Sequence, residues 1–292
     1  MFTPLISAPQ LHTLLTSGQP VMVFDCSFEL MQPGAGDQQY QQAHIPGAVR
    51  ADLDRHLSAA KTATDAASGG RHPLPSRETF AAWLCSVGFS DAMQAVVYDR
   101  QGANYCGRLW WMLKWAGHDA VAVLDGGLQA WQANGGATQS QTSGDTNAPM
   151  SASASNFILK PAKTSLITTE TIAQQLGRPA QNIVDARGAP RFKGEVEPLD
   201  PVAGHMPGAL NRPFNLNFDS TGKFKPAADL RAEFQTLLAG RDPATVVHHC
   251  GSGVSAVPNI IAMEVAGLGA TALYAGSWSE WCSDPTRPTA QG

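Results

Sequence analysis

The sequence predicts an α/β protein made of two tandem domains, each a mainly parallel sheet flanked by helices. Three observations lead to this prediction. Short apolar strands alternate with helix-like segments, the second half of the chain repeats the first, and a loose stretch separates the halves. Strands that alternate with helices form parallel sheets covered on both faces. At 292 residues the chain is long enough for two domains that each bury a core.

The predicted elements recur in the same order in both halves. Six short runs rich in β-branched and apolar residues are predicted as strands: residues 22–25, 95–98, 120–124, 182–185, 245–248 and 271–274. Helices are predicted over residues 109–116 and 256–266, because Gly117 and Gly267 stand where each would end. This order places both halves in the α/β class.

An internal repeat supports the same division. Residues 96–131 align without a gap with residues 246–281, so that Trp131 meets Trp281. In this alignment Arg100 stands where the second copy has Cys250. A thiol in one copy only predicts one working site and one supporting domain.

The composition between the halves is that of a linker. Residues 135–160 are rich in Gly, Ser, Thr, Ala and Asn. We therefore predict a non-catalytic domain at residues 1–140, a linker at 141–160 and a catalytic domain at 161–292. A second loose stretch, residues 59–70, is predicted to be a mobile surface loop.

Charge and cysteine content exclude several classes of function. With a net charge of -4, the chain has no excess positive charge that would attract nucleic acid or an anionic membrane. The five cysteines are odd in number and form no Cys-x-x-Cys pair, which weakens zinc and dithiol-redox hypotheses. The N-terminus has no signal-peptide pattern, and no apolar run reaches the roughly 20 residues of a membrane span. We expect a cytoplasmic protein, since a reducing compartment suits free thiols.

Cys250 is the most informative residue. It stands where a buried strand is predicted to end and a helix to begin, and Gly251-Ser252-Gly253 follows it. In parallel sheets, sites form where loops leave the carboxyl ends of strands. Backbone N–H groups at a helix N-terminus favour the thiolate, and the glycines let the chain turn tightly beneath the sulfur. The pattern predicts a nucleophilic cysteine.

Several motifs together resemble one family. A His-x-Pro-Gly-Ala element occurs at residues 44–48 and again at 205–209, the cysteine loop spans 250–255, and Gly-Ser-Trp-Ser-Glu-Trp occupies 276–281. With the repeat, these features resemble the tandem-domain rhodanese sulfurtransferases over nearly the whole chain. The thiosulfate branch of that family usually has an Arg-Lys pair directly after the cysteine. The uncharged loop here resembles the 3-mercaptopyruvate branch.

The resemblance implies a role for each residue of the cysteine loop. Cys250 would take up a sulfur atom and hold it as a persulfide, in a loop whose N–H groups stabilise the anion: Gly251, Gly253, Val254 and Ser255. Ser252, His72 and Asp54 match a serine, a histidine and an aspartate proposed in the family to relay a proton. The alternatives are a buried, inert cysteine at 250, a helix cap at Ser252, and turn residues at His72 and Asp54.

The substrate carboxylate is expected to meet arginine. Arg191 matches a family arginine that grips the carboxylate, and a planar guanidinium can do so with two hydrogen bonds. Arg187 is a second candidate, with a structural tie as its alternative. The chain departs from the family after Glu197-Pro198, where mercaptopyruvate enzymes usually carry another arginine and this chain has Leu199.

Other histidines are expected to be structural. His44 and His205 occupy matching places in the two copies, which indicates architecture rather than a metal site. His248 and His249 precede the cysteine, and strand alternation directs one of them into the core. We expect packing roles for both.

The resemblance therefore implies transfer of sulfur from 3-mercaptopyruvate to a thiol, thioredoxin or cyanide, with pyruvate released and no metal or organic cofactor. Thiosulfate is the alternative donor, with sulfite released. A non-catalytic persulfide-binding module is a further alternative. A cysteine phosphatase is disfavoured, because its cradle needs an arginine at position 256, which is Ala256 here. The sequence leaves the physiological acceptor and the oligomeric state open.

Overall fold

A computed structural model describes residues 1–32, 34–140, 155–178 and 181–292. These residues group into two compact units, treated separately below. The first unit comprises Met1–Ser58, Pro75–Lys163 and Ser220–Lys223. The second unit comprises Ala59–Leu74, Thr164–Asp219 and Phe224–Gly292. Residues 141–154 of the predicted linker lie outside the described part of the chain.

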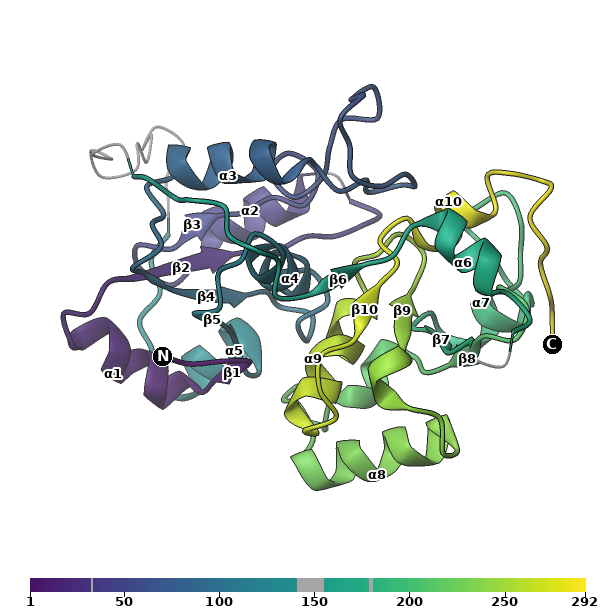
Figure 1. The fold of residues 1–292 in the computed structure, drawn as a ribbon. Coiled ribbons are helices and arrows are strands. Elements are labelled where there is room, and N and C mark those ends of the chain that lie inside the picture. The colour runs from purple at the N-terminus through teal and green to yellow at the C-terminus, as the bar shows by residue number, and fades with distance from the viewer. Residues whose placement is uncertain (33, 141–154, 179–180) are drawn as a thin grey trace. The chain divides into compact units, whose positions relative to one another are not determined.

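The first unit is built on a five-stranded parallel sheet with the strand order β1-β5-β4-β2-β3 (Figure 1). Its strands are β1 (Leu5–Ile6), β2 (Val21–Asp25), β3 (Val49–Arg50), β4 (Gln94–Tyr98) and β5 (Val121–Leu124). Its helices are α1 (Ala8–Thr16), α2 (Ala35–Gln42), α3 (Arg77–Ser86), α4 (Cys106–Trp115) and α5 (Gly127–Ala133).

The second unit has the equivalent order β6-β10-β9-β7-β8, again all parallel. Its strands are β6 (Ser165–Leu166), β7 (Ile183–Asp185), β8 (Leu210–Asn211), β9 (Val247–His249) and β10 (Ala272–Leu273). Its helices are α6 (Thr169–Gln175), α7 (Ala189–Lys193), α8 (Ala227–Leu238), α9 (Val257–Val265) and α10 (Ser277–Trp281), with 3-10 turns η1 (Phe214–Asn217) and η2 (Pro243–Thr245). The α/β class and the duplicated parallel sheets predicted from the sequence are confirmed.

Helices cover both faces of the second sheet. Helix α9 packs against β9 and β10, and α8 packs against α9. Figure 1 shows α6, α7 and α10 on the other side of the sheet. Strand β9 is therefore buried on both faces, which is why both His248 and His249 are fully buried rather than only one of them.

The β9 strand begins later than the sequence predicts. The predicted run is 245–248, whereas the strand covers Val247–His249. Asp242 accepts a hydrogen bond from the backbone N–H of Ala244, and Pro243 opens a 3-10 turn that includes Thr245. A side-chain cap and a proline at the first position of a turn hold these residues outside the ladder.

Tryptophans anchor the cores at matching places in the repeat. Trp131 packs in a hydrophobic core cluster of the first unit, and Trp278 and Trp281 pack in one of the second unit. All three are at least 97% buried. Burial of such large rings removes a large apolar area from water in each core.

Residues 59–74 belong to the second unit, although they lie in the first half of the sequence. The Arg71 backbone N–H donates to Ser279 Oγ over 2.9 Å. A Cβ at Gly70 would collide with the Gly276 carbonyl oxygen, so only glycine permits this close approach. The segment is thereby fixed beside α10 at its C-terminal end.

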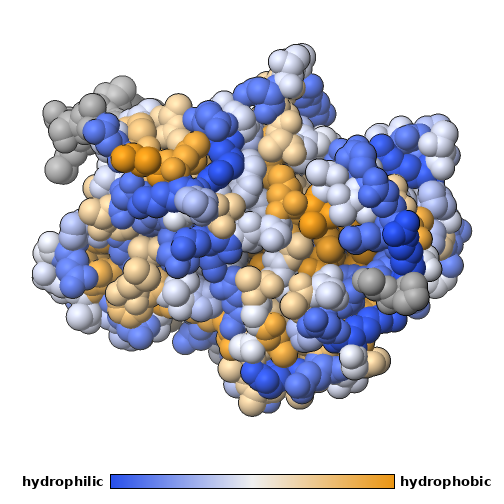
Figure 2. Space-filling view, viewed as in Figure 1, coloured by the Kyte–Doolittle hydropathy of each residue, from blue (hydrophilic) through white to orange (hydrophobic). Residues whose placement is uncertain are grey.

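The surface is mixed in character. Figure 2 shows hydrophilic residues over most of the visible face, with apolar residues distributed among them. No helix in the described part of the chain is long and apolar enough to cross a membrane.

Candidate active site

Cys250 lies at the carboxyl end of β9, in the loop that leads into α9. Its backbone N–H donates to Ser277 Oγ over 3.1 Å, and its carbonyl accepts from the Trp278 N–H over 3.0 Å. The Gly251 carbonyl accepts from the Ser279 N–H over 2.9 Å. The loop is thus clamped to the first turn of α10, which fixes the position of the cysteine.

The loop needs glycine at position 253. Gly253 has a φ of 73°, in the left-handed region, and a Cβ there would overlap the Ala275 carbonyl oxygen. The corresponding residue of the first unit, Ala103, has a φ of 59°. The two copies therefore share the backbone shape of this loop, although only the second carries the thiol.

Comparison with the first unit shows what the loop amides can hold. There the Asp99 carboxylate accepts four backbone N–H bonds of 2.8–3.1 Å, from Gln101, Ala103, Tyr105 and Cys106. The second unit has His249 where the first has Asp99. Within the described residues, the N–H groups of Gly251, Ser255 and Ala256 have no hydrogen-bond acceptor. These amides are available to an anion at position 250.

The thiol itself is deeply placed. Cys250 is 2% exposed, and the loop residues from Gly251 to Val254 are also buried. Two guanidinium groups near Gly251 are less buried, since Arg71 and Arg191 each keep 21% of their side-chain surface exposed.

His72 and Ser252 are brought together as the sequence predicts. His72 Nδ1 lies 2.8 Å from Ser252 Oγ, and both residues are buried. The contact lies within the second unit because residues 59–74 belong to it. An imidazole on a hydroxyl can pass a proton through that hydroxyl.

Asp54, the third member of the predicted relay, belongs to the first unit and is exposed. Asp52, two residues earlier, caps this turn, since its Oδ1 accepts from the N–H groups of Asp54 and Arg55 over 3.0 Å each. The role of Asp54 stays a prediction.

Arg191, on α7, is fixed by two carboxylates. Its Nε and Nη2 donate to Glu197 over 3.1 and 2.6 Å, and Nη2 also reaches Asp200 Oδ2 at 3.1 Å. Glu197 Oε1 in turn accepts from the N–H groups of Leu199 and Asp200. The segment in which the family usually has an arginine is here a tight turn that presents Asp200.

Arg187 is occupied by the fold. Its guanidinium donates to the Asp185 carboxylate, to Glu197 and to the Gly204 carbonyl, and lies 4.7 Å from the Trp278 ring centroid. Burial would lower the pKa of Arg187, but Asp185, Glu197 and Cys250 raise it. This pattern favours the structural tie over direct substrate binding, and places a fixed positive charge near Cys250.

Two buried histidines stay neutral beside the cysteine. Burial lowers the pKa of His248 to about 3 and that of His249 to about 4. His248 Nε2 contacts Met263 Sδ at 3.2 Å, and His249 Nε2 lies 3.6 Å from Asp185 Oδ2. Burial would raise the pKa of Asp185, but His249 and Arg187 hold it below its usual value. These contacts agree with packing roles for the histidines.

His44 and His205 have equivalent surroundings in the two units. His44 Nδ1 lies 2.7 Å from the Tyr40 carbonyl and stacks on that ring, and His205 Nδ1 lies 2.8 Å from the Phe192 carbonyl and stacks likewise. Each thus ties a helix to the following segment. The residues that the structure describes include no group of three or more His, Cys, Asp or Glu side chains able to hold a metal ion.

Sequence reasoning missed Arg71. Its Nη1 donates to Asp200 Oδ1 over 2.6 Å, and its Nη2 would lie 3.0 Å from a Cβ on Gly251. The signal that the sequence offers is its place directly before His72, a predicted site residue.

The charges around the loop balance. Three arginines and three carboxylates are linked by ion pairs at one end of the second sheet: Arg71, Arg187, Arg191, Asp185, Glu197 and Asp200. Their formal charges sum to zero. An anion entering here would be held by directed hydrogen bonds more than by excess positive charge.

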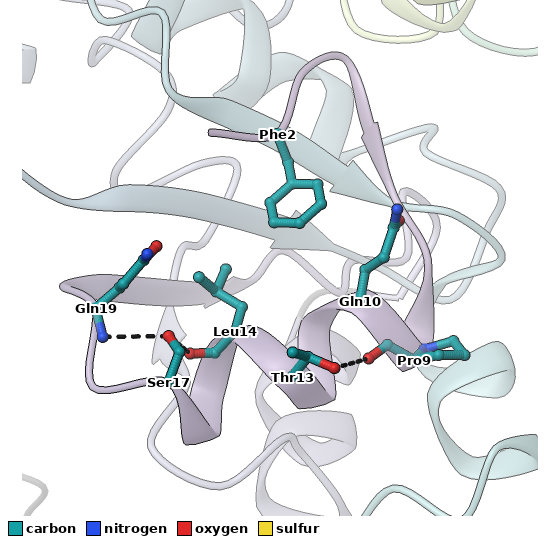
Figure 3. A pocket seen from close by; sticks show the side chains of 7 residues that line it. All are labelled: Phe2, Pro9, Gln10, Thr13, Leu14, Ser17 and Gln19. Carbon is teal, nitrogen blue, oxygen red and sulfur yellow. Dashed lines mark hydrogen bonds between the residues drawn. The ribbon is translucent and has the colours of Figure 1, made fainter.

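A separate hollow of about 370 Å³ lies over α1 in the first unit (Figure 3). The side chains of Phe2 and Leu14 face one another across it, beside Thr13 and Ser17. It has no nucleophilic thiol and no charged side chain among its lining residues. It offers none of the chemistry of the Cys250 loop.

Comparison with known proteins agrees with this geometry. The rhodanese-like domain family matches residues 7–134 and 168–284. A Pseudomonas aeruginosa protein named "Probable 3-mercaptopyruvate sulfurtransferase" is 45% identical over 99% of this chain and 98% of its own length. The thiosulfate/3-mercaptopyruvate sulfurtransferase 2 of Arabidopsis thaliana is 36% identical over 98% of this chain and 86% of its own.

A solved structure gives the same result. The crystal structure of SseA from Escherichia coli, a 3-mercaptopyruvate sulfotransferase, superposes with a TM-score of 0.76 at 28% identity and covers 96% of this chain and 100% of its own. The full-length sequence match, the two rhodanese-like domains and the uncharged cysteine loop lead to one assignment. The chain belongs to the tandem-domain rhodanese family, in the branch of the 3-mercaptopyruvate sulfurtransferases.

Proposed function

We propose that this protein is a sulfurtransferase that moves sulfur from 3-mercaptopyruvate to a thiol or cyanide through a persulfide on Cys250, and releases pyruvate. The observation that carries the proposal is the placement of Cys250 at the start of a loop in which the N–H groups of Gly251, Ser255 and Ala256 have no acceptor within the described residues. The His72–Ser252 pair and two arginines belong to the same compact unit. Relatives named 3-mercaptopyruvate sulfurtransferase support the choice of reaction.

The first half-reaction forms one S–S bond and breaks one C–S bond. The Cys250 thiolate attacks the sulfur of 3-mercaptopyruvate, and the electron pair of the C–S bond passes to the departing enolate of pyruvate. The donor's thiol proton stays with the new outer sulfur or is lost to water. The loop amides stabilise the thiolate and the persulfide anion alike.

The enolate must gain a proton to become pyruvate. The Ser252 hydroxyl, 2.8 Å from His72 Nδ1, is the group that we assign to deliver it, with the imidazole replacing that proton. Asp54 is proposed as the carboxylate that orients His72, following the family resemblance. The second half-reaction attacks the outer sulfur with a thiolate, of thioredoxin or a small thiol, or with cyanide, and returns Cys250 to its thiolate.

The balanced charge of the site supports 3-mercaptopyruvate over thiosulfate. Thiosulfate is a dianion, whereas 3-mercaptopyruvate carries one carboxylate, and the ion-paired cluster has no excess positive charge to offset a second negative charge. Thiosulfate remains the second candidate because relatives of this chain bear both donor names. A kcat/KM for thiosulfate above that for 3-mercaptopyruvate would reverse the order.

The first unit is proposed to be non-catalytic. Arg100 occupies the place of the cysteine, and its guanidinium contacts Asp25, Ser27 and two backbone carbonyls. The corresponding loop amides are already filled by the Asp99 carboxylate. All five cysteines are free thiols, which suits the cytoplasmic setting that we propose.

A single experiment tests the nucleophile. Mass spectrometry of protein mixed with 3-mercaptopyruvate should find one added sulfur atom on the peptide that contains Cys250, with pyruvate released in equal amount. Cys250→Ser should abolish both signals. The matched control is Cys85→Ser, which removes a partly exposed thiol in the first unit. Full turnover by Cys250→Ser would refute the assignment.

A further inference from the structure

Asp200 places a negative charge beside the cysteine loop. Its side chain is 3% exposed, and it accepts from Arg71 Nη1 through Oδ1 at 2.6 Å and from Arg191 Nη2 through Oδ2 at 3.1 Å. Other nitrogens of the same two guanidinium groups lie near Gly251, since a Cβ there would be 3.0 Å from one and 3.5 Å from the other. The Asp200 carboxylate is therefore separated from the cysteine loop by one layer of guanidinium groups.

The three carboxylates near the loop differ in how far their charge is offset. Asp185 is fully buried and pairs with Arg187 and, at a longer distance, with His249. Glu197 accepts from two arginines and also from two backbone N–H groups of its own turn. Within the residues that the structure describes, Asp200 accepts from two arginines and from no backbone N–H. Asp200 is thus the acid whose charge the backbone does not offset.

The turn that carries Asp200 supplies no positive charge of its own. Mercaptopyruvate enzymes usually have an arginine where this chain has Leu199, directly before Asp200. The turn here therefore adds one negative charge to the loop surroundings and no cation. The positive potential that the arginines create near Gly251 is reduced by the same amount.

A fixed negative charge affects ligands according to their own charge. At one distance, the repulsion between a carboxylate and a dianion is twice that between the carboxylate and a monoanion. A side chain that is nearly buried is screened by salt much less than an exposed one. The Asp200 carboxylate also occupies one N–H of each arginine, which leaves fewer donors for a ligand with several charged oxygens.

We propose that Asp200 is a specificity-determining residue, whose buried negative charge selects sulfur donors with a single negative charge against dianions such as thiosulfate. This inference rests on the proposed function and assigns the choice between its two candidate donors to one residue. Asp200 acts through the electrostatic potential at the loop and through the donors that it occupies. No contact between Asp200 and the sulfur donor is required.

The competing explanation is that Asp200 only secures the segment 59–74 through Arg71. Loss of a purely structural contact would displace His72 and lower kcat/KM for both donors by the same factor. Loss of a charge filter would change the ratio of the two kcat/KM values in favour of the dianion. The ratio therefore separates the two explanations, even where a variant is less active.

The test uses Asp200→Asn, which keeps the shape of the side chain, and Asp200→Ser, which removes the same charge with a smaller group. Asp200→Glu retains the charge. The matched control is Asp229→Asn, an exposed aspartate on α8 of the same unit. Thiocyanate formation from cyanide gives kcat/KM for 3-mercaptopyruvate and for thiosulfate at one fixed ionic strength. Calorimetry on the same variants in Cys250→Ser protein gives the affinities for pyruvate, a monoanion, and sulfate, a dianion, without turnover.

Asp200→Asn should raise the ratio of thiosulfate to 3-mercaptopyruvate kcat/KM by roughly 5- to 50-fold. The ratio of sulfate to pyruvate affinity should rise in the same direction, and Asp200→Ser should behave alike. Asp200→Glu and Asp229→Asn should keep the wild-type ratios. Unchanged ratios in Asp200→Asn and Asp200→Ser would overturn the proposal. If wild type turned over neither donor while Asp200→Asn shifted the two affinities as expected, the proposed function would be refuted and this inference upheld.

Discussion

Substitution by alanine should have different effects at the two glycines of the cysteine loop. Gly253 has a left-handed backbone, and a Cβ there would overlap the Ala275 carbonyl oxygen. Gly251 has no such backbone restriction, and its nearest neighbours are the ends of flexible side chains, Arg71 and Arg191. Alanine at 253 should therefore damage the fold, and alanine at 251 should damage donor binding.

The magnitude follows from the local geometry. A left-handed backbone costs a residue with a Cβ about 1–2 kcal/mol. Overpacking against a fixed carbonyl adds about 1–3 kcal/mol, and the stiffer unfolded chain of the alanine variant offsets about 0.4–1 kcal/mol. Gly253→Ala should thus lower the free energy of unfolding by about 1–5 kcal/mol. Gly251→Ala should stay within about 1 kcal/mol of wild type, since arginine ends can move by a few tenths of an ångström.

Urea unfolding, followed by far-ultraviolet circular dichroism and tryptophan fluorescence, measures the first effect. Trp278 and Trp281 lie in the core of the unit that carries both glycines, so they report on its unfolding. The KM for 3-mercaptopyruvate measures the second effect, and Gly251→Ala should raise it because the added methyl group would lie 3.5 Å from Arg191 Nη1, where the donor carboxylate is expected to bind. If both variants lost the same stability, or if Gly251→Ala kept the wild-type KM, the geometric reasoning would be wrong.

Three further predictions concern neighbouring groups. Ser252→Ala and His72→Gln should each lower kcat by about 10²–10⁴-fold with a smaller change in KM, and the double variant should lose no more than the worse single variant; fully additive losses would exclude a shared proton path. Because buried His248 and His249 keep pKa values of about 3 and 4 against 6.5 for an ordinary histidine, the folded state binds fewer protons than the unfolded state below pH 6.5. The free energy of unfolding should therefore fall by about 2 kcal/mol per histidine between pH 7 and pH 5; His248→Gln should remove about half of that dependence, and an unchanged slope would contradict it. Arg187→Lys should destabilise the second unit by about 2–4 kcal/mol in urea, since the ammonium cannot replace the bidentate contact; wild-type stability would show the contact to be dispensable.

The sequence predicts best what is local. The strand that ends at His249, the turn at Gly253 and the helix that follows are neighbours along the chain, so their residue types predict them; the hydrogen bonds to α10 that fix the cysteine are long-range. The repeat predicts that the two units fold alike, and their sheets do have equivalent strand orders. The place of Cys250 at the carboxyl end of a strand therefore follows from the sequence, whereas the central position of that strand in its sheet is known only from the structure.

Long-range contacts do not follow from such local patterns. Arg71 and Asp200 are far apart in the sequence, and nothing local marks them as an ion pair beside Gly251. The family resemblance points to His72, but not to its membership of the second unit, which depends on the Gly70 approach to Gly276. Arg187 is ambiguous in the sequence because an arginine beside a strand-end aspartate fits both a substrate clamp and a buried ion pair.

The two units neutralise a similar buried aspartate with arginines from different places. In the first unit Asp25 is paired with Arg100, which occupies the cysteine position, and position 27 is a serine. In the second unit the corresponding Asp185 is paired with Arg187, two residues later in the loop that follows the strand, so position 250 is left for the thiol. The place of this arginine thus decides which loop can carry a thiol, the difference that we propose separates a supporting unit from a catalytic one.

This difference predicts that a cysteine alone does not restore a site. Arg100→Cys would place a thiol in the first loop, yet Asp25 would lose its buried partner, at a cost of about 3–5 kcal/mol. The amides that should hold the thiolate would still be bound by Asp99. In a Cys250→Ser background, Arg100→Cys should therefore show no added sulfur by mass spectrometry and a lowered unfolding midpoint. Sulfur loading on residue 100 would mean that free loop N–H groups are not needed to activate the cysteine. The explanation given for the reactivity of Cys250 would then be wrong.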